Sequence, residues 1–231
     1  MSEQAKRSKK AKPSAISAAV AGSIVSVGLI VAVAAILLFA WIADEVFEGD
    51  SIVIDNTLRE FVHSYAADWL TALMQATSFL GSTLFLMAAT LTLIGVFLVR
   101  RQHRSAIILA VVMAGAVVLN YVLKVSFQRP RPLPYFDTPL PASFSFPSGH
   151  SLFSACFFGI TAWLIASQMR YSSAKAGVWA AAIVLILLVG LSRVYLGVHY
   201  PTDIAAGFLA ALVWVSTVIT ADTVTKRFSP D

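Results

Sequence analysis

Six long apolar segments restrict the fold of this chain more than any other feature. An α-helix rises about 1.5 Å per residue, so about 20 apolar residues cross a hydrocarbon core about 30 Å thick. All six segments reach that length, and they cover residues 16–42, 76–99, 105–126, 149–169, 176–197 and 203–222. The pattern predicts an all-α membrane protein built as a bundle of six transmembrane helices.

The composition agrees with a membrane protein and argues against the soluble classes. Hydrophobic residues make up 58% of the 231 residues, charged residues make up 13%, and the mean hydropathy is +0.79. A soluble domain carries about twice that charged fraction. The net charge of +5 comes from basic residues scattered among the loops, so we expect no nucleic-acid partner. The single cysteine, Cys156, lies in an apolar run and is predicted to be a small buried hydrophobic residue.

The sequence predicts one domain with a short tail at each end. The first apolar segment follows a basic start, as a signal peptide would, but it is too long for a signal sequence and lacks a clear cleavage site. It is therefore interpreted as an uncleaved anchor. We expect a basic tail over residues 1–15, a single six-helix domain over residues 16–222 and a second tail over residues 223–231.

Basic residues in the loops predict the orientation in the membrane. Most of them fall on one side, and by the positive-inside tendency that side is cytoplasmic. They are Lys6, Arg7, Lys9, Lys10, Lys12, Arg100, Arg101, Arg104, Arg170, Lys175, Lys226 and Arg227. Both termini are then expected in the cytoplasm, and the remaining basic residues lie on the outer side. Those are Arg59, Lys124, Arg129, Arg131 and Arg193.

Two outer loops differ in character. Residues 43–75 begin with acidic residues and continue with apolar residues at helical spacing, which is typical of an amphipathic helix in the outer membrane interface. Such a helix could be a structural lid over the bundle or an element that guides lipid. Residues 127–147 hold six of the nine prolines, so we expect an irregular connection there.

The first of three polar motifs is Lys124, followed after six residues by Arg131 and Pro132. Lys124 ends an apolar segment, where a lysine can simply extend its ammonium to the interface. Arginine presents paired donors that match two phosphate oxygens, and lysine adds a point charge. Together the two cations could neutralise a phosphomonoester. Arg129 lies off this spacing and is interpreted as a residue that faces lipid headgroups.

The second motif, Pro147, Ser148, Gly149 and His150, opens the fourth apolar segment. Serine is a good N-cap, glycine lets a ligand approach the backbone, and a helix N-terminus attracts anions. Ordinary helix capping explains Ser148 and Gly149 equally well. His150 would face the same anion, or it could be a polar residue of the interface.

The third motif contains Arg193, His199 and Asp203 between the last two apolar segments. Asp203 follows His199 by four residues, which is one helical turn if the helix begins near His199, so its carboxylate can accept a hydrogen bond from one ring nitrogen. The other ring nitrogen is then free to act as a nucleophile. Arg193 adds a third cation that could bind phosphate. The alternative is that Asp203 only caps the helix, but that would not account for the two neighbours.

The order and spacing of these motifs resemble the full signature of the type 2 phosphatidic acid phosphatase superfamily. Its membrane branch has six transmembrane helices, and its soluble branch includes vanadium haloperoxidases and bacterial acid phosphatases. The resemblance covers residues 124–203 and is complete at the motif positions. It implies that His199 attacks phosphorus with support from Asp203, and that His150 protonates the leaving oxygen. It also implies a phosphate-binding set, namely Lys124, Arg131, Ser148, Gly149 and Arg193.

The resemblance implies a lipid phosphatase, similar to the phosphatidylglycerophosphatase B-like enzymes. Expected substrates are phosphatidylglycerophosphate, phosphatidic acid or undecaprenyl diphosphate, hydrolysed through a phosphohistidine in a bacterial inner membrane. The motifs lie on the outer side, so the site would face the periplasm or exterior. No cluster of acidic residues or of cysteine and histidine suits a metal, so we expect metal-independent hydrolysis without a cofactor. The alternative is a non-catalytic protein that binds or translocates lipid phosphates, although binding alone needs no pair of histidines.

Overall fold

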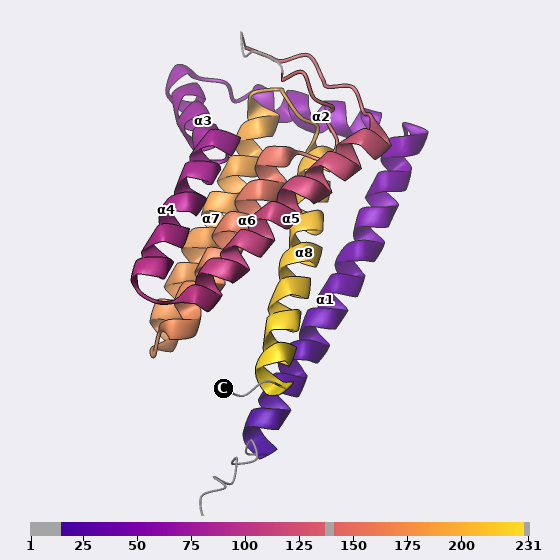
Figure 1. Ribbon diagram of the computed structural model, residues 1–231. Coiled ribbons are helices and arrows are strands. Elements are labelled where there is room, and N and C mark those ends of the chain that lie inside the picture. The colour runs from indigo at the N-terminus through magenta and orange to yellow at the C-terminus, as the bar shows by residue number, and fades with distance from the viewer. Residues whose placement is uncertain (1–14, 137–140, 229–231) are drawn as a thin grey trace, which may run out of the picture.

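The computed structural model describes residues 15–136 and 141–228, and these residues form eight helices and no strand. Figure 1 shows the long helices packed side by side, with α2 lying across one end of the bundle. At the opposite end α1 begins and α8 ends (Figure 1). The helices are α1 (Ala15–Glu48), α2 (Ile52–His63), α3 (Asp68–Leu80), α4 (Thr83–Val99), α5 (His103–Phe127), α6 (Gly149–Gln168), α7 (Ser172–Tyr195) and α8 (Pro201–Phe228).

The predicted spans correspond to these helices with one exception. Within the described residues, α1, α5, α6, α7 and α8 are each long and apolar enough to cross a membrane. The predicted span over residues 76–99 is not one continuous helix, because α3 and α4 meet there at a bend of 48°. The bundle therefore has five candidate spans, or six when the bent pair is counted as one span.

Close packing requires a glycine at the bend between α3 and α4. A Cβ atom at Gly81 would overlap the side chain of Val189 on α7 and lie 3.3 Å from the ring of His150. Ser82 then caps α4, and its hydroxyl accepts a hydrogen bond from Phe85 N at 3.2 Å. The residues on both sides remain apolar, so hydropathy alone does not reveal the break.

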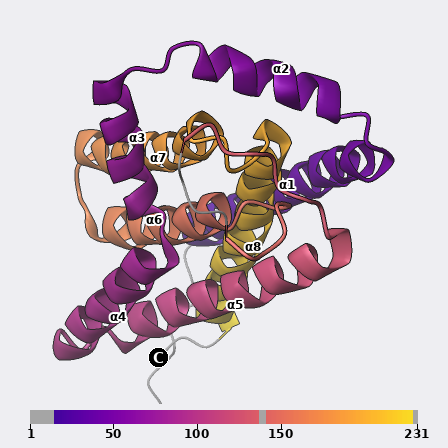
Figure 2. The ribbon, with the colours of Figure 1, turned by 90° about the horizontal axis from the view of Figure 1, so that it is seen from above.

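Helix α6 occupies the middle of the bundle and packs against α4, α5, α7 and α8 (Figure 2). Fully buried side chains from α5, α6 and α8 form the main core between these helices. Cys156 belongs to this core, which confirms the prediction of a buried hydrophobic role. Helix α1 packs mainly against α8, at the edge of the bundle.

Helix α2 is the amphipathic helix predicted within residues 43–75. Apolar side chains such as Val53, Ile54 and Phe61 are exposed, as suits a helix that lies in a membrane interface. Its charged residues Asp55 and Arg59 instead point inward and are buried. The polar face of α2 therefore covers the end of the bundle where α5 and α7 end and where α6 and α8 begin (Figure 1).

Candidate active site

The turn between α7 and α8 carries the histidine and the aspartate of the third motif. Gly197 has a φ of +74°, a conformation that favours glycine, and it reverses the chain shortly before α8 begins at Pro201. Asp203 lies in the first turn of α8, and its Oδ2 is 3.2 Å from His199 Nδ1. Both side chains are buried. The hydrogen bond expected from the four-residue spacing is therefore present.

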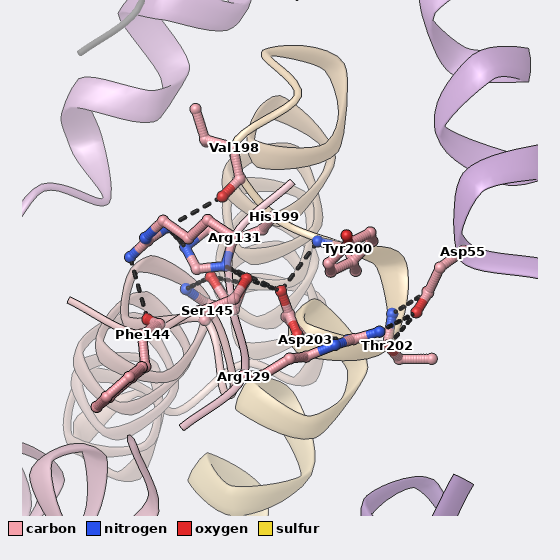
Figure 3. Close-up of polar contacts among 12 residues, drawn as sticks. Asp55, Arg129, Arg131, Phe144, Ser145, Val198, His199, Tyr200, Thr202 and Asp203 are labelled. Atoms are coloured by element: carbon pink, nitrogen blue, oxygen red, sulfur yellow. Dashed lines mark hydrogen bonds and ion pairs between the residues drawn. The ribbon is translucent and has the colours of Figure 1, made fainter. Parts of the chain in front are cut away.

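Several donors hold the carboxylate of Asp203 in place (Figure 3). Oδ2 accepts hydrogen bonds from Tyr200 N at 2.9 Å and from the Ser145 hydroxyl. Oδ1 accepts a hydrogen bond from Arg129 Nη1 at 2.7 Å. With donors on both oxygens, the carboxylate cannot rotate freely, so it fixes the orientation of the His199 ring.

The contact between Arg131 and His199 indicates the tautomer of the imidazole. Arg131 Nη1 lies 2.9 Å from His199 Nε2 (Figure 3). A guanidinium only donates hydrogen bonds, so Nε2 must accept one. The ring proton is then assigned to Nδ1, which donates to Asp203. This arrangement leaves the lone pair of Nε2 directed at the cation that would bind a phosphoryl oxygen.

The chain that follows α5 holds the guanidinium of Arg131. Its Nε donates to Ser143 O at 2.7 Å, and Nη1 donates to Val198 O at 3.0 Å. Nη2 donates to the Ser143 hydroxyl at 3.1 Å. Arg131 is only half-buried, so part of the fork can reach a ligand. The backbone thus fixes the first motif beside the third.

Lys124 is buried near the end of α5 and does not extend to the interface. Its Nζ donates hydrogen bonds to Phe144 O and, at 3.4 Å, to Ser145 O. The interpretation of Lys124 as a simple interfacial lysine is therefore wrong. Its ammonium lies behind the segment that delivers Ser145 to Asp203 and His199.

The second motif forms the N-terminus of α6, as predicted. The Ser148 hydroxyl accepts hydrogen bonds from Ser151 N at 3.4 Å and from the Ser151 hydroxyl at 3.1 Å. Ser148 N donates to Asp203 O at 2.9 Å, which joins the start of α6 to the start of α8. Ser148 therefore acts as a helix cap in this structure. Gly149 lies against Asn120, whose Oδ1 would be 3.2 Å from a Cβ atom at Gly149.

His150 and Arg193 border the break between α3 and α4. The ring of His150 lies against Gly81. Arg193 is buried on α7, and its Nη1 donates to the Ser78 hydroxyl at the end of α3. Among the described residues, Arg193 Nε has no hydrogen-bond partner, so the guanidinium keeps donor capacity. These two residues therefore lie on the α3 side of the site, away from the Asp203 contacts.

Arg129 contradicts its interpretation as a residue that faces headgroups. It is buried, and its Nη2 donates to Asp55 Oδ2 at 2.7 Å while Nη1 donates to Asp203 Oδ1 at the same distance. Burial alone would lower the pKa of Arg129, but the two carboxylates outweigh it and raise that pKa above its usual value. The ring of Tyr200 lies below the guanidinium, with its centroid 4.1 Å from Cζ.

The surroundings keep the His199 imidazole neutral at neutral pH. Burial lowers its pKa to about 4, and the positive charges of Arg131 and Arg193 act in the same direction. The hydrogen bond and charge of Asp203 oppose them but do not outweigh them. Burial also lowers the pKa of Arg131. A neutral, oriented imidazole beside arginines can attack a bound phosphoryl group.

Sequence reasoning missed four residues at or beside this site. Ser145 lies in the proline-rich connection, where no local pattern predicts a contact. Arg129 meets Asp55 and Asp203 only in the folded chain, because 74 residues separate it from each of them. Asn120 precedes Lys124 by four residues, which places both on one face of α5. Among the described residues, no group of three His, Cys, Asp or Glu side chains could hold a metal ion.

The fold and the sequence of this chain match those of membrane phosphatases. Residues 105–226 match the model of the PAP2 superfamily. A Bacillus subtilis protein named phosphatidylglycerophosphatase B is 35% identical over 162 residues, which cover 69% of this chain and 79% of that protein. An undecaprenyl-diphosphatase from Sulfolobus acidocaldarius is 33% identical over 122 residues, covering 51% of this chain and 54% of that protein.

A solved structure agrees with the sequence relatives. The crystal structure of a transmembrane PAP2 type phosphatidylglycerolphosphate phosphatase from Bacillus subtilis matches with a TM-score of 0.78 at 31% sequence identity. The match covers 86% of this chain and 98% of that one. This chain belongs to the PAP2 superfamily, as its three motifs predicted. It is a multi-pass membrane enzyme of the class that hydrolyses phosphate esters.

Proposed function

We propose that this enzyme removes phosphate from a membrane lipid through a phosphohistidine on His199. The observation that carries the proposal is the pair of contacts on that ring, with Nδ1 on Asp203 and Nε2 beside Arg131. The Nε2 lone pair would attack phosphorus while the bond from phosphorus to the lipid oxygen breaks. Asp203 would stabilise the positive charge that develops on the ring.

The remaining motif residues would complete the reaction. His150 would donate a proton to the departing lipid oxygen and then accept one from the water that attacks the phosphorus–nitrogen bond. That second step would release inorganic phosphate and restore neutral His199. Lys124, Arg131 and Arg193, with Ser148 and the backbone N–H groups near Gly149, would neutralise the phosphoryl oxygens. The reaction would need no metal ion, because side-chain cations supply the positive charge.

The position of the site supports a membrane lipid as the substrate. The motifs lie at the end of the bundle covered by α2, where a phosphate at headgroup depth could enter while its tails stay in the bilayer. Phosphatidylglycerophosphate, phosphatidic acid and undecaprenyl diphosphate each carry a phosphate at headgroup depth and an apolar tail that stays in the bilayer. The relatives named phosphatidylglycerophosphatase and undecaprenyl-diphosphatase support both a monoester and a diphosphate as candidates.

Phosphate release from these lipids by purified protein tests the proposal. His199→Ala and His150→Ala should abolish release while the protein still inserts into membranes. His103→Ala is a matched control, because His103 is exposed at the start of α5, at the other end of the bundle. With a labelled phosphate donor, denaturation during turnover should trap an acid-labile, base-stable label that His199→Ala lacks. Lipid binding without release would instead indicate a non-catalytic binding protein.

We also propose that the site faces the periplasm or exterior of a bacterial inner membrane, with both termini in the cytoplasm. The basic loop residues support this orientation. Single cysteines can test it in a Cys156→Ser background, because Cys156 is the only native cysteine. An impermeant maleimide should label Ser64→Cys beside α2 in intact cells, but Ser172→Cys only after permeabilisation. The reverse labelling pattern would place the site on the cytoplasmic side.

A further inference from the structure

Arg129 connects the interfacial helix α2 to the aspartate of the candidate active site. It lies between two carboxylates, 2.7 Å from Asp55 Oδ2 and 2.7 Å from Asp203 Oδ1. The side chains of both aspartates are fully buried, and that of Arg129 is 9% exposed. Figure 3 shows the three side chains in one line from α2 to the start of α8. The sequence places Asp55 and Arg129 outside all three motifs.

Asp55 also binds the turn of α8 that carries Asp203. Its Oδ1 accepts a hydrogen bond from Thr202 N at 3.0 Å, and its Oδ2 accepts one from the Thr202 hydroxyl at 2.7 Å. The same hydroxyl accepts a hydrogen bond from Arg129 Nη1 at 2.8 Å. Asp55 therefore holds both the guanidinium and the backbone next to Asp203.

The two oxygens of Asp203 have separate partners. Oδ1 faces Arg129, and Oδ2 faces His199 Nδ1. Arg129 thus limits rotation of the carboxylate and keeps Oδ2 on the ring. The charges alternate from Asp55 through Arg129 to Asp203, and they end at an imidazole that must gain positive charge when it is phosphorylated. A change of charge at Asp55 or Arg129 should therefore alter the electrostatic potential at His199.

We propose that Asp55 and Arg129 are positioning residues that hold Asp203 on His199 and set the proton affinity of the nucleophile. The inference rests on the proposed function, in which His199 attacks phosphorus. The alternative is a purely structural role, in which the ion pair only holds α2 against the bundle. A pair that only fastens α2 would leave the kcat of the folded protein unchanged, whereas positioning residues would affect both kcat and the titration of His199.

Titration of His199 by NMR of protein with labelled histidine tests the proposal without relying on activity. The His199→Ala variant identifies the signal. Asp55→Asn removes a negative charge, so the pKa of His199 should fall by about half a unit. Arg129→Gln removes a positive charge, so that pKa should rise by about one unit. Arg129→Lys keeps the charge and should leave the pKa close to that of the wild type.

The expected pKa shifts must be distinguished from the effects of the other titratable and charged groups around His199. Arg131 faces it from the connection after α5, Arg193 from α7, His150 from α6 and Asp203 from α8. None of these is altered in the variants. Arg59→Lys is the matched structural control, because Arg59 fastens α2 through Leu133 O at 2.8 Å and Gly197 O at 3.2 Å and touches neither carboxylate. It removes contacts of α2 without changing any charge, so the His199 titration should stay unchanged.

Opposite shifts in Asp55→Asn and Arg129→Gln would support the proposal, and each variant should lower kcat about tenfold or more with little change in KM. Unchanged titration in both variants, or shifts of the same sign, would overturn it. If Asp55→Asn does not fold, the comparison of Arg129→Gln with Arg129→Lys decides the matter alone. An inactive wild-type protein would overturn the proposed function instead, since the titration would still report the coupling.

Discussion

Arg131 Nη1 lies 2.9 Å from His199 Nε2, so the guanidinium faces the lone pair of that nitrogen. A phosphoryl group attacked by His199 would therefore lie within reach of the guanidinium. The contact also places a donor opposite the nitrogen that must not carry a proton. In the proposed reaction, the Arg131 guanidinium would thus face the attacking nitrogen and also help to neutralise the phosphate.

Replacing Arg131 should consequently lower catalysis more than binding. Arg131→Ala is expected to lower kcat/KM by about 10² to 10³, because a preorganised donor to a charged transition state is lost. Arg131→Lys should recover part of this loss, since it restores the charge but not the paired donors. Steady-state phosphate release measures both effects. Equal activity of the Lys variant and the wild type would show that the fork geometry is not needed.

Asp203→Asn tests the tautomer assigned to His199. The amide has nearly the same shape, but its N–H₂ group can turn toward Nδ1 and move the ring proton to Nε2. The lone pair would then no longer face phosphorus, and kcat should fall by about 10³ to 10⁴. Circular dichroism and thermal unfolding should show that the fold is retained. Substantial activity in Asp203→Asn would contradict this role of the carboxylate.

The motifs could be predicted because their geometry is local. The contact from His199 to Asp203 joins residues only four positions apart, and the cap at Ser148 needs only the start of a helix. The partners of Arg129 could not be predicted, because Asp55 and Asp203 each lie 74 residues away from it in the sequence. The break at Gly81 was equally hidden, since the apolar residues continue through it and only the packing against Val189 requires a glycine.

Gly81→Ala should disturb the site from a distance. The added Cβ would overlap Val189 and approach His150, so we expect about 1–3 kcal/mol of destabilisation together with reduced phosphate release. Gly95→Ala is the matched control on α4, because nothing lies within 4 Å of its Cβ position. Apparent Tm values in detergent and activity assays compare the two variants. Similar results for both would mean that the α3–α4 break tolerates a side chain.

Stability should depend on pH through His199. Burial and the nearby arginines lower its pKa to about 4 in the folded protein, whereas an unfolded histidine has a pKa of about 6.5. The unfolded state then binds more protons between these values, so the free energy of unfolding should decrease as pH falls from about 6.5 to about 4. The full effect is of the order of 3 kcal/mol. His199→Gln should show a smaller decrease in apparent Tm over the same window.

Catalysis is expected to persist in excess EDTA. Three side-chain cations, Lys124, Arg131 and Arg193, can neutralise the phosphoryl oxygens without a metal ion. Phosphate release measured before and after chelation should therefore agree within error. Activity that disappears with EDTA and returns with magnesium would contradict a reaction based on side-chain cations alone.

The link between Asp55 and Thr202 spans 147 positions of the chain, from an early interfacial helix to the first turn of α8. A ribosome completes α2 long before it makes Asp203, so a nascent chain cannot form the contacts among Asp55, Arg129 and Asp203 until α8 has been made. The proposed active site would therefore be assembled only when insertion of the chain is nearly complete.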